Sequence, residues 1–169
     1  VEVAETPPEE GLFELAARGY DLVIAEQYPG RTREHRSGLE RDVLGSDPVR
    51  IASATPVRDL ASLRSRAWVL EPRGTAAREW AVQQCRAVGF EPDVRFELAD
   101  LAAHVPLIAA GHAVGLLPDL LWVEQPALRL TDLPGSPARE IFTAVRRSDA
   151  DRPSIRLVRE ALADAFAAR

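Results

Sequence analysis

The chain contains neither lysine nor methionine, and Cys85 is its single cysteine. One cysteine excludes an internal disulfide. Its place on a predicted helix indicates a buried structural thiol, because free cysteine is among the most buried residue types. The absence of lysine, with alanine abundant, is typical of a GC-rich genome. Because an initiating methionine is missing, we expect the sequence to be part of a longer protein.

Long apolar runs and clusters of basic charge are also missing. No stretch approaches the roughly 20 apolar residues that cross a bilayer, and no signal peptide is visible. We therefore expect a cytoplasmic location and no membrane partner. The net charge is -5, and basic residues occur only in short pairs such as Arg146-Arg147. Binding of nucleic acid by this chain itself is not expected, because that binding depends on clustered positive charge.

Signatures of catalysis are absent as well. Neither the G-x-S-x-G of hydrolases nor the G-x-G-x-x-G of dinucleotide enzymes occurs. The three histidines, His35, His104 and His112, form no H-x-x-x-H pair, and none has metal-ligand spacing to Cys85. We expect no enzyme activity, no metal and no cofactor. His104 lies on a predicted helix, where a structural role is the commoner one.

Strands and helices alternate regularly across residues 67–121. This alternation predicts a parallel sheet built from βαβ units. Thr75 and Asp100 are candidate N-caps of the two helices, and Gly89 and Gly111 end them. Pro106 falls inside the second helix, so either the helix kinks there or the helix has a different boundary. The expected elements are a strand at 68–70, a helix at 75–88, a strand at 93–97, a helix at 100–110 and a strand at 113–117.

The first part of the chain predicts a further βαβ unit over residues 1–25. Residues 1–5 alternate as a strand does, residues 9–18 have helical spacing that Gly19 ends, and residues 21–25 are a continuous apolar run typical of a buried parallel strand. Two more strands, 39–44 and 49–54, are expected around Gly45-Ser46-Asp47-Pro48, a strong turn sequence.

The last part of the chain predicts short strands and a final helix. We expect strands at 127–130 and 140–146 around a turn at 134–137. Residues 154–168 form an amphipathic helix with Ile155, Val158, Leu162 and Phe166 on one face.

This order of elements predicts two α/β lobes joined by two crossing strands, at 51–54 and 116–118. Lobe I would hold residues 1–50 and 121–169, and lobe II residues 51–120. A cleft between two such lobes is a standard place for a small ligand.

Five motifs, taken in order, resemble the effector-binding domain of LysR-type transcriptional regulators. They are Gly19-Tyr20-Asp21-Leu22-Val23-Ile24, Arg73-Gly74-Thr75 after a strand, Ala87-Val88-Gly89-Phe90-Glu91-Pro92, Phe96-Glu97 leading to Asp100-Leu101, and the closing sequence IAAGHAVGLLP at 108–118. The resemblance implies a type II periplasmic-binding-protein-like α/β fold, here truncated at its N-terminus. It also implies a homodimer or tetramer in the full-length protein. DNA would be bound only by a winged helix-turn-helix that this chain lacks.

The resemblance further implies a small-molecule effector in the cleft, contacted by loops at strand ends. A helix start such as the one after Thr75 favours an anionic group, for example a carboxylate. Plain capping by Thr75 and Asp100 is the alternative explanation of these residues. The positions of this chain that correspond to the family's ligand-contacting loops are Thr6, Pro7, Pro8, Arg73, Gly74, Thr75, Ala99, Asp100, Leu101 and Pro118.

Two other classes of protein stay open at this point. A solute-binding protein of a transport system shares the fold, and a dimerisation module would explain Trp80 and Trp122. The sequence upstream in the parent chain distinguishes a regulator from a solute-binding protein. A regulator has a helix-turn-helix there, and an exported binding protein has a signal peptide.

Overall fold

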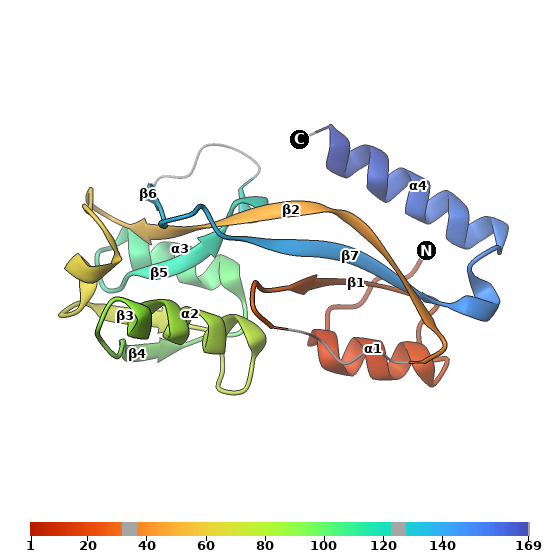
Figure 1. Cartoon of the computed structure of the whole chain (residues 1–169), viewed down its shortest axis with the longest axis horizontal. Coiled ribbons are helices and arrows are strands. Elements are labelled where there is room, and N and C mark those ends of the chain that lie inside the picture. Colours follow the sequence, from red (N-terminus) through yellow and green to blue (C-terminus); the bar gives the residue numbers. More distant parts are fainter. Residues whose placement is uncertain (32–36, 123–127, 169) are drawn as a thin grey trace. The chain divides into compact units, whose positions relative to one another are not determined.

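The computed structural model describes residues 1–31, 37–122 and 128–168, which fall into two units. Unit 1 comprises Val1–Ser46 and Glu140–Arg169, and unit 2 comprises Asp47–Arg139. The chain passes between them within two strands, β2 (Leu39–Ser53) and β7 (Ala138–Arg146), drawn in orange and blue in Figure 1.

The division between the units differs from the boundaries expected at 50/51 and 120/121. Residues that follow β5 (Gly115–Pro118) remain in unit 2 because β6 (Arg129–Asp132) pairs antiparallel with β2. The amide of Val49 also donates to the carbonyl of Pro137 at 3.0 Å. The second passage therefore lies in β7, and residues 116–118 lie inside unit 2.

Unit 1 is built on strands of the sheet whose order is β1-β7-β2-β5. Strand β1 (Leu22–Gln27) pairs antiparallel with β7. Helix α1 (Pro8–Ala16) covers one face, because its apolar residues pack with those of the strands. This core contains Leu12, Leu15, Ala25, Leu39, Phe142 and Ala144.

Helix α4 (Pro153–Ala167) lies against the opposite face of β2 (Figure 1). Its Arg159 forms ion pairs with Glu40 at 2.9 Å and with Asp42 at 3.3 Å. The predicted apolar stripe is confirmed, since Ile155 is buried and Val158, Leu162 and Phe166 are half-buried. At 15 residues α4 is too short to cross a bilayer, and none of the other helices in the described ranges has the length and apolar character to do so.

The βαβ unit expected over residues 1–25 is wrong. Residues 1–5 form no strand; Val1 is fully exposed and Val3 is 91% exposed. Strand β1 is antiparallel to its neighbour, and only its Ala25 is buried. Alternating residues indicate which faces a strand would have, but a strand forms only where a neighbouring backbone accepts its hydrogen bonds. Residue Arg18, not Gly19, takes the left-handed conformation that ends α1, with φ of 71°.

The turn expected at Gly45-Ser46-Asp47-Pro48 is also wrong, because β2 runs through it without a break. Asp47 is 1% exposed and accepts hydrogen bonds from the Leu120 amide and from Arg139 Nε, both at 2.8 Å. The ring of Phe166 occupies the space where a side chain at residue 45 would begin. Tertiary contacts thus override the local preference of these residues for a turn.

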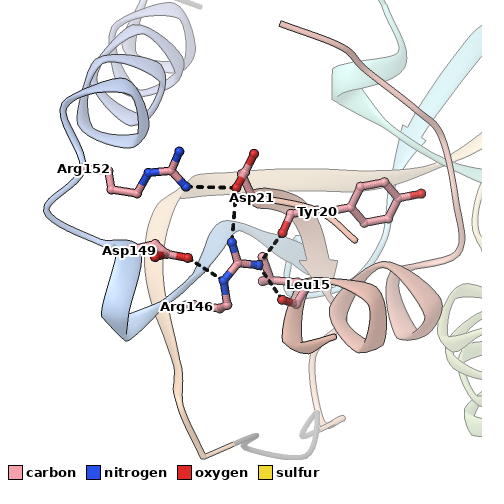
Figure 2. A network of polar contacts seen from close by, with 6 residues as sticks. All are labelled: Leu15, Tyr20, Asp21, Arg146, Asp149 and Arg152. Carbon is pink, nitrogen blue, oxygen red and sulfur yellow. Dashed lines mark hydrogen bonds and ion pairs between the residues drawn. The ribbon is translucent and has the colours of Figure 1, made fainter. Parts of the chain in front are cut away.

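A buried arginine ties four segments of unit 1 together (Figure 2). The guanidinium of Arg146 donates to the carbonyls of Leu15 and Tyr20 and to the carboxylates of Asp21 and Asp149. Leu15 belongs to α1, and Asp149 lies on the segment between β7 and α4. Asp21 also accepts from Arg152 at 3.1 Å. The end of β7 is therefore held to α1, to the start of β1 and to the approach to α4.

Unit 2 contains the predicted parallel pair. Strands β3 (Ala67–Leu70) and β4 (Asp93–Glu97) are parallel and are connected by α2 (Ala76–Ala87), which confirms one βαβ unit. Helix α3 (Leu101–Ala109) follows, with Pro106 inside it as expected. Val114 forms a parallel bridge with Trp68, whereas β5 turns to pair antiparallel with β2. Short 3-10 turns complete the unit at Leu60–Leu63 and Asp119–Leu121.

Cys85 is fully buried on α2, as predicted, and burial raises the pKa of its thiol to about 12. At pH 8 the reactive thiolate is then on the order of 10⁻⁴ of the population. We expect a thiol reagent such as Ellman's reagent to modify Cys85 at least about a hundredfold more slowly in the folded protein than in urea. No other thiol contributes to the signal, because Cys85 is the single cysteine. Rapid stoichiometric modification of the native protein would show that the thiol is accessible.

Candidate functional site

The turns that follow β3 and β4 lie at the same edge of unit 2. The two strands are parallel, with Leu70 opposite Glu97, so their carboxyl ends meet. The amide of Leu98 donates to the carbonyl of Leu70 at 3.1 Å. In α/β proteins, ligands bind outside this edge of a parallel sheet. The structure therefore brings together two of the predicted groups, Arg73-Gly74-Thr75 and Ala99-Asp100-Leu101.

The first turn is held by Thr75, which caps α2. Its hydroxyl Oγ1 accepts from the amide of Arg78 at 3.3 Å and donates to the carbonyl of Pro72 at 2.9 Å. Gly74 has φ of +89°, a left-handed conformation that favours glycine. Arg73 and Gly74 are exposed. The predicted cap is confirmed, and the two residues before it are accessible to a ligand.

The second turn is organised by Asp100 and His104. Asp100 caps α3, accepting from the Ala102 amide at 2.8 Å. His104 is 2% exposed, and its Nε2 lies 2.9 Å from the carbonyl of Leu98. Since a carbonyl only accepts, Nε2 carries the proton and donates it. Burial lowers the pKa of His104 and so favours the neutral ring. This contact agrees with the structural role predicted for His104.

Sequence reasoning missed Arg78, which joins the two turns. Its Nη1 donates to the carbonyl of Glu71 at 3.1 Å and to Glu97 Oε2 at 2.8 Å. The side chain is 9% exposed. The sequence did contain a signal that Arg78 is buried. Arg78 lies three residues before Ala81 and seven before Cys85, and this helical spacing places it on the buried stripe of α2.

The remaining predicted contacts lie elsewhere in the two units. Thr6, Pro7 and Pro8 are at the start of α1 in unit 1, where the Pro7 carbonyl accepts from the Gly11 amide at 2.9 Å. Pro118 is buried at the end of β5 in unit 2. His112 is exposed, and His35 lies outside the described residues. Within 1–31, 37–122 and 128–168, no three His, Cys, Asp or Glu side chains are grouped to hold a metal ion.

Known proteins similar to this chain are transcriptional regulators. Transcriptional dual regulator GltC of Bacillus subtilis (strain 168) is 42% identical over 65 residues, which are 38% of this chain and 22% of GltC. The crystal structure of CbnR, a LysR family transcriptional regulator, is similar with a TM-score of 0.70 at 19% identity, over 98% of this chain and 59% of CbnR. The chain thus spans less than two thirds of either protein.

A solved regulatory domain gives a similar match. The Synechocystis PCC6803 CcmR regulatory domain, solved in complex with 2-PG, has a TM-score of 0.75 at 16% identity, over 95% of this chain and 80% of that one. The two α/β units and these similarities define the type II periplasmic-binding-protein-like fold of LysR regulatory domains. The family described as "LysR substrate binding domain" matches residues 1–167, so the chain belongs to that family.

Proposed function

We propose that this chain is the effector-sensing and dimerisation domain of a LysR-type, DNA-binding transcriptional regulator. The family match over residues 1–167 is the observation that carries the proposal. In this role the domain binds a small molecule and catalyses no reaction. DNA is bound by a winged helix-turn-helix outside these residues, and the full-length protein is a cytoplasmic homodimer or tetramer.

We place the effector against the turns after β3 and β4, in contact with Arg73-Gly74-Thr75 and Ala99-Asp100-Leu101. The first amides of a helix have no acceptor within the helix, and the helix dipole favours negative charge there. With the exposed Arg73 beside them, the first amides of α2 suit an anionic group such as a carboxylate. The complex of CcmR with 2-PG supports a small-molecule ligand for this fold. Contacts from Thr6, Pro7, Pro8 and Pro118 remain predictions from the family resemblance.

Thr75→Ala tests this site. A thermal-shift screen of small organic acids first identifies a ligand, since one that binds only the folded state raises the melting temperature. We expect the substitution to weaken the affinity of that acid by about tenfold, because it removes a hydrogen-bonding hydroxyl and disturbs the first turn of α2. Isothermal titration calorimetry measures the change.

Asp59→Ala is the matched control. Asp59 also caps a turn in unit 2, accepting from the Ser62 amide at 2.9 Å, but it precedes β3 in the sequence and belongs to neither of the two turns. It is expected to lower stability without changing affinity. An affinity unchanged in Thr75→Ala would leave Thr75 as a plain helix cap. A signal peptide upstream in the parent chain, in place of a helix-turn-helix, would favour the solute-binding alternative.

A further inference from the structure

The guanidinium of Arg78 stands at the junction of three segments of unit 2. Through Nη1 it reaches the carbonyl of Glu71, the residue after β3, and the carboxylate of Glu97, the last residue of β4. Its own amide donates to the hydroxyl of Thr75. One residue therefore holds both ends of the turn 71–75 and links that turn to the end of β4.

Packing alone does not explain a buried guanidinium at this place. Burying a charged group costs free energy, and an apolar side chain of similar volume fills such a space without that cost. The partner carboxylate of Glu97 is 46% exposed, so the ion pair is only partly withdrawn from water. An apolar side chain could supply neither this ion pair nor the hydrogen bond to the carbonyl of Glu71, which is the next residue after β3. That bond fixes where the turn leaves β3.

Only a short piece of the first turn is not held by Arg78. This piece consists of Pro72, Arg73 and Gly74. The carbonyl of Pro72 accepts from both the amide and the hydroxyl of Thr75, and Arg73 and Gly74 are exposed. At the end of β4, Arg78 bonds Glu97, and the next residue is Leu98. The amide of Leu98 donates to the carbonyl of Leu70, and its carbonyl accepts from His104. Displacing the guanidinium would remove one hydrogen bond at the start of the turn 71–75 and one just before the turn 98–100 at the same time.

We propose that Arg78 is a positioning residue: it fixes the turn 71–75 and the turn 98–100 in one arrangement, so that the two present a single surface to a ligand. The proposal rests on the effector site proposed above for the role of these turns. The linkage of the turns by Arg78 stands on the contacts themselves.

Hydrogen exchange at four amides tests the proposal without a ligand. Thr75 and Leu98 report on the two turns, since their amides donate to Pro72 and Leu70. Val69 and Val114 report on the core of unit 2, where their amides donate to Val114 and Ala67. In Arg78→Met, which keeps the apolar stem, we expect exchange at Thr75 and Leu98 to accelerate about tenfold more than at Val69 and Val114.

Two variants complete the experiment. Arg86→Met removes an exposed arginine of the same helix, paired with Glu91, and is expected to leave all four amides unchanged. Arg78→Lys keeps a donor and is expected to restore part of the protection at Thr75 and Leu98. Equal acceleration at all four amides in Arg78→Met would overturn the proposal, since it would show a purely structural role. That result would leave the effector site untouched, whereas an acid that binds equally well to Thr75→Ala would remove Thr75 from the proposed site and leave the linkage standing.

Discussion

Arg146→Met is expected to lower the free energy of unfolding by about 3–5 kcal/mol, the range for removing one partner of a buried ion pair. The variant keeps most of the apolar stem. It leaves the carbonyls of Leu15 and Tyr20 and the carboxylate of Asp149 without their common donor. Urea denaturation followed by circular dichroism measures the loss.

Arg152→Met is the matched control for this change. It removes the same charge from a neighbouring arginine that is 50% exposed and contacts Asp21. An exposed ion pair contributes at most about 1 kcal/mol, so little change is expected. If Arg146→Met were as stable as Arg152→Met, the network in Figure 2 would not be holding unit 1 together.

The hydrogen-bond network of Arg146 also makes the stability of unit 1 depend on pH in the acidic range. The hydrogen bond from Arg146 holds the pKa of Asp149 below its ordinary value of 3.8. A carboxyl group with a lowered pKa stabilises the folded state above its unfolded pKa, and this contribution is lost as the pH falls through the lowered value. In Arg146→Met the pKa of Asp149 should rise toward 3.8. Carboxyl NMR titration of both proteins detects that rise.

Asp47→Ala is expected to lower the free energy of unfolding by about 3 kcal/mol. The substitution removes a fully buried carboxylate that accepts from Arg139 Nε and from the Leu120 amide. Asp132→Ala is the control, because Asp132 is 70% exposed and its ion pair with Arg50 spans 3.5 Å. Chemical denaturation of the three proteins gives the comparison.

The double variant Asp47→Ala, Arg139→Met makes this test specific to the pair. Replacing both partners of a buried ion pair with apolar residues is often nearly neutral. We therefore expect the double variant to recover part of the stability that Asp47→Ala loses. Losses that simply add would show that Asp47 acts through other contacts.

The accuracy of sequence-based prediction depended on how far away each partner stood. Within residues 67–121, Thr75 and Asp100 cap helices through amides three and two residues further along the chain, and both caps were predictable. Arg78 and Asp47 were not identified, because their partners Glu97 and Arg139 lie 19 and 92 residues further along the chain. Large sequence separation also explains why the unbroken strand β2 was not predicted. Its residues 45–48 favour a turn locally, but they are kept in the strand by contacts from β7, α4 and the segment after β5.

The ion pair at Asp47 also joins the two points at which the chain enters and leaves unit 2. Asp47 and Arg139 are the first and last residues of unit 2, and they are hydrogen-bonded to each other at 2.8 Å. A segment whose two ends meet in this way has the form of a domain inserted into another. Unit 2 therefore has the form of an insertion, and the two peptide bonds that bound it, Ser46–Asp47 and Arg139–Glu140, lie within the continuous strands β2 and β7.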